Sequence, residues 1–323
     1  MASKSSMYAM YEAVQHEMRQ RKDMTWIFEL TPAVASNPGT PVINLEKEFG
    51  RTRVTNTGID EMWMAGATLG AGLVGTTAVT YIPYQGSQIP FEIIQNHAGK
   101  LHYMSGGDST MPVVFIIEIS GQAAGFGGQH SDYEADSYYA HIAGVKVVVP
   151  SRPYDAKGMM ASAIRDTNPV VYLFPQGLRQ LSEEVPDEQF TVPLDKAAMR
   201  TTGNDLTIVG SGAGMSMVLD ATDQLQKAGM KVEAIDLRSL KPMDTETLVK
   251  SVQKTKRLLT FDQSYYTLCP GAEVIARVAE NVDGARYKRI AFPDAPPPAS
   301  PEMFNWMRPN AGHIVAAAKR VVG

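Results

Sequence analysis

The chain has 323 residues, of which 44% are hydrophobic and 20% are charged, a balance typical of a globular protein rather than a disordered or fibrous one. Its length exceeds what one hydrophobic core usually organises, so we expect about two domains. The net charge of -4, without a Lys/Arg block, argues against nucleic-acid binding, and a single cysteine, Cys269, excludes an internal disulfide and a metal–thiolate cluster.

The N-terminal region has early charges and lacks the apolar core of a secretory signal. Together with the single cysteine, this predicts a reducing compartment and a cytoplasmic location. From Met7 to Arg21 apolar residues recur at helical spacing, which predicts an amphipathic helix. Trp26-Ile27-Phe28 predicts a strand, and a proline-containing loop follows it.

No charged residue occurs between Glu61 and Glu92, a stretch long enough to span a bilayer. Glycines, prolines and polar side chains interrupt it, however. We therefore expect a buried helix of small residues followed by a buried strand, and no membrane span.

Three nearly continuous Val/Ile-rich runs follow, at 113–119, 145–150 and 170–174, with a helix beginning near Tyr154 between the last two. Uncharged runs separated by helices are typical of a parallel sheet that is covered on both faces. The segment 175–193 is proline-punctuated and acidic and is interpreted as a linker. Beyond it the alternation restarts, which predicts a smaller second α/β domain ending in a helix near 314–322.

The segment Gly210–Gly214 follows a predicted strand and opens a predicted helix, as the phosphate-binding turn of a dinucleotide site does. Asp236 follows at a distance suitable for binding a ribose. The third glycine of that fingerprint is missing, so packing within an assembly domain is the alternative interpretation that we favour.

Six segments in order resemble the β subunit of the first, decarboxylating component of 2-oxo acid dehydrogenase complexes, of the pyruvate, branched-chain or acetoin type. They are GIDEMWMAG (58–66), HYMSGG (102–107), GQHS (128–131), 140–174, IDLRSLKPMD (235–244) and KRIAFPD (288–294). The resemblance covers nearly the whole chain. It implies an α/β fold with a transketolase-like pyrimidine-binding domain, a parallel sheet and a smaller C-terminal α/β domain.

The resemblance also implies the domain limits and the partner. We expect an N-terminal helix and strand at 1–35, the pyrimidine-binding domain at 36–174, the linker at 175–193 and the transketolase C-terminal-like domain at 194–323. In this family thiamine diphosphate is shared with an α subunit in an α2β2 heterotetramer, and the α subunit holds the diphosphate and Mg²⁺ through a Gly-Asp-Gly motif. This sequence contains no Gly-Asp-Gly, which fits a β subunit.

By resemblance, Glu61 is the carboxylate that hydrogen-bonds the pyrimidine ring nitrogen and promotes the imino form of the cofactor, which removes the proton from the thiazolium carbon. From the residue alone, an interaction of a first-turn carboxylate with the helix dipole is the favoured interpretation, and only the resemblance reverses that preference. His130, in a glycine-rich loop, matches the histidine that the family places near the reacting carbon. Tyr84 and Gln85 are expected to contact the cofactor.

The segment 163–168 resembles a family loop that holds a potassium ion. Its expected ligands are the carbonyl of Val113 together with Ala163, Ile164, Asp166 and Asn168. The alternative is an ordinary helix C-terminus that Asn168 caps before Pro169.

Three departures from the family surround the expected site. An acidic position after the first strand is replaced by Leu30-Thr31-Pro32, the segment 81–88 is one residue short, and Phe174 replaces a glutamate. We therefore expect thiamine chemistry with an unusual substrate.

The expected activity is decarboxylation of a 2-oxo acid, or cleavage of an acyloin or diketone, with transfer of the acyl group to lipoamide on an acyltransferase core. The alternatives are a non-oxidative thiamine-dependent lyase or carboligase and a non-catalytic assembly subunit. Fold alone does not decide among them.

Overall fold

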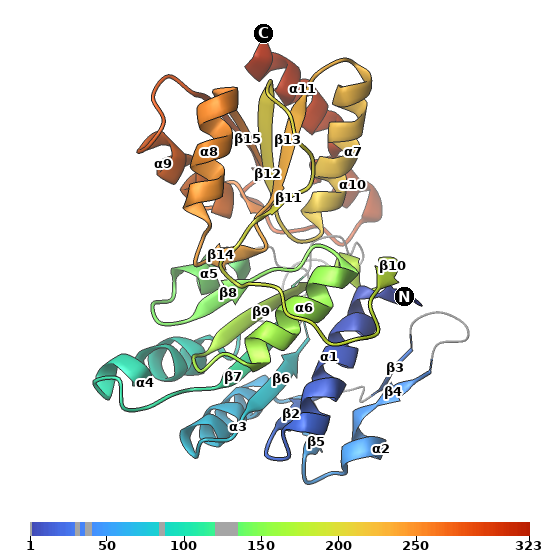
Figure 1. Cartoon of the computed structure of the whole chain (residues 1–323), viewed down its shortest axis with the longest axis vertical. Helices are drawn as coiled ribbons and strands as arrows, with labels where there is room; N and C mark the ends of the chain where they lie inside the picture. Colours follow the sequence, from blue (N-terminus) through green and yellow to red (C-terminus); the bar gives the residue numbers. More distant parts are fainter. Residues whose placement is uncertain (1, 30–32, 36–40, 84–87, 120–134) are drawn as a thin grey trace.

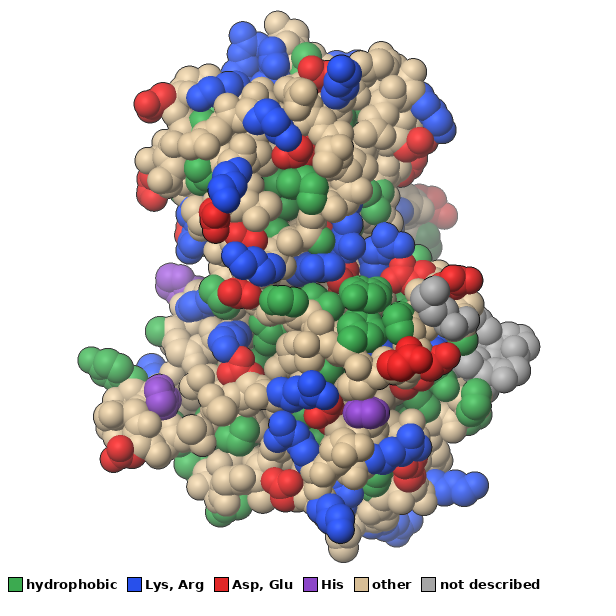
Figure 2. Space-filling model, viewed as in Figure 1, with side chains coloured by type: hydrophobic (Ala, Val, Ile, Leu, Met, Phe, Trp, Pro, Cys, Tyr) green, Lys and Arg blue, Asp and Glu red, His purple; other side chains and the backbone are tan. Residues whose placement is uncertain are grey.

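The structure is a computed structural model that describes residues 2–29, 33–35, 41–83, 88–119 and 135–323. It comprises two α/β domains stacked end to end, with the N-terminal domain coloured blue to green and the C-terminal domain yellow to red (Figure 1). Figure 2 shows a narrowed waist between them, along which Lys, Arg, Asp and Glu side chains lie. No helix among these residues is long and apolar enough to cross a membrane.

The helices and strands of the N-terminal domain are β1 (Ala2–Ser5), α1 (Ser6–Gln20), β2 (Thr25–Phe28), β3 (Ala33–Val34), β4 (Ile43–Asn44), α2 (Leu45–Phe49), β5 (Val54–Asn56), α3 (Glu61–Leu73), β6 (Ala78–Ile82), the π-helix η2 (Ile93–Ala98), α4 (Gly99–Met104), β7 (Val113–Ile119), α5 (Ala135–His141), β8 (Lys146–Val148), α6 (Pro153–Ile164), β9 (Val170–Pro175), the 3-10 helix η4 (Gln176–Leu178) and β10 (Ser182–Val185). Those of the C-terminal domain are β11 (Ala198–Met199), β12 (Leu206–Gly210), α7 (Gly214–Lys227), β13 (Val232–Asp236), β14 (Ser239–Lys241), α8 (Thr245–Thr255), β15 (Arg257–Tyr265), α9 (Pro270–Ala279), β16 (Arg286–Phe292), α10 (Pro301–Met307) and α11 (Ala311–Val322).

The larger sheet has the strand order β14-β8-β9-β7-β6-β2-β5, and every described pairing in it is parallel except that of β14. One face packs on α1 and α6, and the other on α3, η2 and α5. Strand β6 is buried along its whole length and follows α3. The predicted parallel sheet and the predicted small-residue helix with its buried strand are therefore confirmed.

Two segments that we expected to lie outside the pyrimidine-binding domain, 1–35 and 175–193, contribute helices and strands to the N-terminal domain. Strand β2 lies inside the large sheet between β5 and β6, and α1 buries its apolar side in the core below α6. Strand β10, within the expected linker, pairs antiparallel with β1 from Ala2↔Val185 to Ser5↔Ser182. The first and last strands of the domain thus pair with each other.

The smaller sheet has the order β11-β13-β12-β15-β16, with α7 and α11 on one face and α8 and α9 on the other. Gly212, in the turn between β12 and α7, has φ +53°. A Cβ there would lie 2.8 Å from the side chain of Val149 and 3.0 Å from that of Pro175, both in the other domain. Close packing between domains therefore accounts for this glycine, in agreement with the assembly interpretation of 210–214.

Candidate active site

Glu61 is the first residue of α3 and is 7% exposed. The helix begins there because the Asp60 side chain accepts a hydrogen bond from the Trp63 N–H at 2.9 Å, which satisfies one of the free amides of the first turn. No hydrogen bond between described residues reaches the Glu61 carboxylate. Ligands of parallel α/β sheets bind outside the carboxyl ends of the strands, and α3 begins on that side, after β5.

Glu29 directly follows β2 and brings a second carboxyl group to the same edge of the sheet. It is 3% exposed, and its Oε2 has no hydrogen-bond partner among the described residues. Burial, reinforced by the negative charge of Glu61, raises the pKa of Glu29 to about 7, although the Asp60 backbone N–H donates to it. Glu29 therefore exchanges a proton near neutral pH beside Glu61.

Glu29 is a residue that sequence reasoning missed. The acidic position was sought in Leu30-Thr31-Pro32, whereas an acid stands one residue earlier, at the end of the strand. The sequence pattern could have indicated Glu29. A glutamate directly after an apolar strand places a charged side chain at a buried position, and charged side chains are seldom buried.

A buried ion pair lies at the carboxyl end of the same sheet. Arg179 Nε is 2.5 Å from Glu118 Oε1, at the end of β7, and Arg179 also donates to the Tyr81 hydroxyl at 3.2 Å. Glu118 is fully buried and stands opposite Phe174 in the sheet register. Beside the position where Phe174 replaces the family glutamate, the structure thus provides an acid from the neighbouring strand.

Three of the expected site residues, His130, Tyr84 and Gln85, lie outside the residues that the structure describes. The other histidines considered are His97 in η2, His102 in α4 and His141 at the end of α5. His97 lies 3.3 Å from Glu92, and His102 Nδ1 lies 2.7 Å from the Ser109 carbonyl. Both contacts are local, to residues within one or two turns of the same segment.

The expected potassium loop connects α6 to β9. The Thr167 carbonyl accepts from the Met111 N–H at 2.9 Å, which brings the loop close to Val113 at the start of β7. The Asp166 carboxylate, however, is already bound by Lys146 Nζ, and its other oxygen accepts from the Asn168 N–H at 3.0 Å. An ammonium group thus pairs with the one charged side chain of the set, so a potassium ion here would have to be held by neutral oxygens, and the site remains a prediction.

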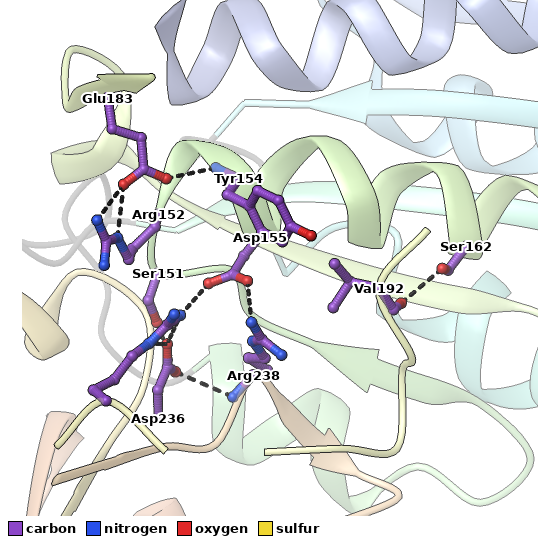
Figure 3. A network of polar contacts seen from close by, with 10 residues as sticks. Ser151, Arg152, Tyr154, Asp155, Ser162, Glu183, Val192, Asp236 and Arg238 are labelled. Carbon is purple, nitrogen blue, oxygen red and sulfur yellow. Dashed lines mark hydrogen bonds and ion pairs between the residues drawn. The ribbon is translucent and has the colours of Figure 1, made fainter. Parts of the chain in front are cut away.

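A network of charged side chains joins the two domains (Figure 3). Asp155, near the start of α6, is fully buried and binds Arg200 and Arg238 from the C-terminal side of the chain. Asp236, at the end of β13, accepts from the Ser151 hydroxyl at 2.8 Å and from Arg200 at 2.6 Å. Asp236 therefore serves the domain contact, and its carboxylate is not free for a ribose.

Comparison with known proteins agrees with this architecture. Residues 4–180 match the pyrimidine-binding domain of transketolase, and residues 184–314 match the transketolase C-terminal domain. The fold also matches a solved split-gene transketolase, described as an inactive β4 tetramer, with a TM-score of 0.80 over 99% of both chains at 19% identity. The fold and the matched domains define a protein of the transketolase-like class.

Relatives that match nearly the whole of this chain narrow the class to one family. The chain is 37% identical to the pyruvate dehydrogenase E1 component subunit β of Rhizobium meliloti, over 99% of this chain and 70% of that protein. It is 33% identical to the subunit of the same name from Bacillus subtilis, over 100% and 99%, and 34% identical to the mitochondrial one of Saccharomyces cerevisiae, over 97% and 87%. The chain belongs to this family, the β subunits of thiamine-diphosphate-dependent 2-oxo acid dehydrogenases.

Proposed function

We propose that this chain supplies the cofactor-activating half of a shared active site, with Glu61 as the group that binds the pyrimidine ring of thiamine diphosphate. The observation that carries the proposal is that Glu61 is buried at the ligand-binding edge, while no described residue hydrogen-bonds its carboxylate. A buried carboxylate of this kind is costly unless a ligand completes it. A protonated ring nitrogen would do so.

Thiamine diphosphate, when bound, supplies a nucleophilic thiazolium carbon. In the proposed site the Glu61 carboxylate accepts a hydrogen bond from the pyrimidine ring nitrogen, in a pocket that is dry enough to strengthen that bond. Glu29 would hold a proton near neutral pH beside Glu61. His130 would stabilise charge near the reacting carbon, and Tyr84 and Gln85 would contact the cofactor.

The other half of the site is proposed to come from an α subunit in an α2β2 assembly, with Mg²⁺ and the diphosphate on that subunit. Two features support this. The sequence lacks Gly-Asp-Gly, and the outer face of α3 beside Glu61 exposes Met62 and Trp63 and has open space at Gly66 and Gly70. A smooth apolar helix face next to half a site is typical of a subunit interface. The name of the similar split-gene transketolase, an inactive β4 tetramer, agrees with the need for a second chain.

We further propose that the substrate is a 2-oxo acid, an acyloin or a diketone, and that the acyl group passes to lipoamide on an acyltransferase core. The changed surroundings of the site, with Glu118–Arg179 beside Phe174, support an unusual substrate, and a non-oxidative lyase or carboligase on the same scaffold is the second candidate. A non-catalytic assembly subunit is the least favoured, because such a subunit has no use for a buried Glu61 whose carboxylate no described residue hydrogen-bonds.

The experiment is to co-purify the chain with its α subunit and to screen 2-oxo acids, diketones and acyloins for thiamine-dependent turnover, with and without an artificial oxidant. Glu61→Gln, which keeps the size and removes the charge, is expected to lower turnover at least about 100-fold, or about 2.7 kcal/mol, while α2β2 still forms. Glu46→Gln, at an exposed pair with Arg51, is the matched control. Full activity of Glu61→Gln would refute the proposed role, and turnover that does not require an oxidant would select the lyase.

A further inference from the structure

Strand β16 forms one edge of the C-terminal sheet, and no described strand pairs with its outer side. On the inner side, the Arg286 N–H donates to the Lys256 carbonyl at 3.0 Å. Because successive residues of a strand turn their backbone groups to opposite sides, Tyr287, Arg289 and Ala291 present theirs to the open edge. An open edge of this kind is a template for another strand.

A groove of about 690 Å³ follows this edge, between β16 and α11. All six residues from Arg286 to Ala291 line it, together with Ala317 and Val321 of α11 and with Met307. Side chains of consecutive residues point to opposite faces of a sheet, so a cavity that touches six consecutive residues runs along the strand edge. The groove therefore has the shape of an extended chain.

The groove is strongly positive. Arg286, Lys288, Arg289 and Arg320 line it, and no Asp or Glu does. No ion pair between described residues involves any of these four. Arg289 is nevertheless held in place, because it stacks at 4.1 Å over the Tyr266 ring and donates to the Tyr266 carbonyl at 3.1 Å.

Some exposed cations elsewhere on the same domain have acidic partners one helical turn away, such as Lys227 with Asp223, Lys250 with Glu246 and Arg277 with Glu273. The four cations of the groove have no such ion pair among the described residues, and gathered in one concave site they would attract an anionic partner.

We propose that the β16–α11 groove binds an extended acidic segment of a partner protein, which adds as a strand to β16. The acidic side chains would meet the four cations, and the segment's backbone would pair with the open edge, the two contributions of recognition by strand addition. A small polyanion such as a phosphate would use the cations but leave the backbone groups unused, which is why we favour a peptide. This inference is independent of the thiamine site.

The test uses the full chain and fluorescent peptides of about ten residues, the length of a long strand. One alternates Glu with Val, a second alternates Glu with Pro, and a third alternates Lys with Val. The Glu-Val peptide is expected to bind and to slow hydrogen exchange at the amides of Tyr287, Arg289 and Ala291. The Glu-Pro peptide is expected to bind at least about tenfold more weakly, since proline removes every second backbone N–H and fixes φ away from regular strand values, and the Lys-Val peptide not at all.

Charge-reversing variants locate the binding. Arg320→Glu and Lys288→Glu should each weaken binding of the Glu-Val peptide at least about tenfold, whereas the matched Lys250→Glu, on the opposite face of the sheet, should leave it unchanged. Equal affinity for the Glu-Val and Glu-Pro peptides, or displacement of the peptide by equimolar pyrophosphate, would assign the groove to small anions instead. Failure of the Glu-Val peptide to bind, with the fold intact by circular dichroism, would also overturn the proposal and leave the charges as protection of an open edge.

Discussion

Arg238 Nη2 and Asp155 Oδ1 lie 2.6 Å apart and join the C-terminal domain to the N-terminal domain. The Asp155 carboxylate is fully buried and also binds Arg200, and Asp236 binds Arg200 as well, so two carboxylates balance two guanidinium groups at the waist. Removing one member of a buried charged set leaves the others without compensation, and the cost exceeds the net value of the original pair.

We therefore expect Asp155→Ala to lower the free energy of unfolding by about 3–5 kcal/mol, measured by urea denaturation. The control is Arg152→Ala, because the pair of Arg152 with Glu183 is partly exposed and is expected to contribute less than about 1 kcal/mol. A loss at Asp155 no larger than that at Arg152 would contradict the buried-network interpretation.

Substitutions at the glycines of α3 can distinguish positions that pack within the chain from positions that are open to a partner. A Cβ at Gly66 or Gly70 would meet no atom within 4 Å, whereas one at Gly72 would lie 2.4 Å from Met111 Sδ and 2.7 Å from Val113. Gly66→Ala and Gly70→Ala should stabilise the isolated chain by up to about 1 kcal/mol through helix propensity. Gly72→Ala should destabilise it.

For association with the α subunit we expect the opposite effect of the Gly66 and Gly70 substitutions. If the open face of α3 is the interface, Gly66→Ala and Gly70→Ala should weaken α binding in sedimentation or calorimetric titrations while raising the melting temperature of the isolated chain. Unchanged association in both variants would show that the α subunit contacts another face.

Glu29 predicts a pH dependence with a definite sign. Its pKa in the folded protein, about 7, lies above the ordinary value of 4.5. The folded state therefore binds the proton more tightly, and stability falls as pH rises through that window. Glu29→Gln stays neutral, so its stability relative to the parent chain should rise by about 1–3 kcal/mol between about pH 5 and about pH 8.

Parallel chemical denaturation of the two proteins across that pH range measures the difference. Asp136 and Asp262, whose pKa values burial also raises, to about 7 and about 6, are present in both proteins and cancel. A difference that does not change with pH would mean that Glu29 titrates at its ordinary pKa.

The loop at 163–168 gives a prediction about cations. Because Lys146 neutralises Asp166, replacing K⁺ by a large organic cation should leave the melting temperature of the parent chain unchanged. Lys146→Met removes the internal cation, so that variant should be stabilised by K⁺ in a titration followed by thermal unfolding. Strong K⁺ stabilisation of the parent chain would instead show that the loop binds the ion alongside Lys146.

The sequence predicts the elements that burial alone decides. The run at 113–119 has the predicted limits, and the helix predicted from Met7 to Arg21 is found as α1 within one residue at each end, because uninterrupted apolar runs and amphipathic spacing depend only on near neighbours. Strand β10 was missed, since what makes Ser182–Val185 a strand is β1, at the other end of the domain. The ion pair of Glu118 with Arg179 was missed for the same reason, as 61 residues separate the partners in the sequence.

Strand β14 has a consequence for how the chain can be divided. It belongs by sequence to the second domain but pairs with β8 through Ser239↔Val148 and Lys241↔Val147, and so completes the sheet of the first. A truncation at the apparent boundary near residue 193 would strip the first sheet of its outermost strand. The two lobes are therefore not interchangeable modules, and a chimaera that exchanges the C-terminal lobe has to bring a matching edge strand with it.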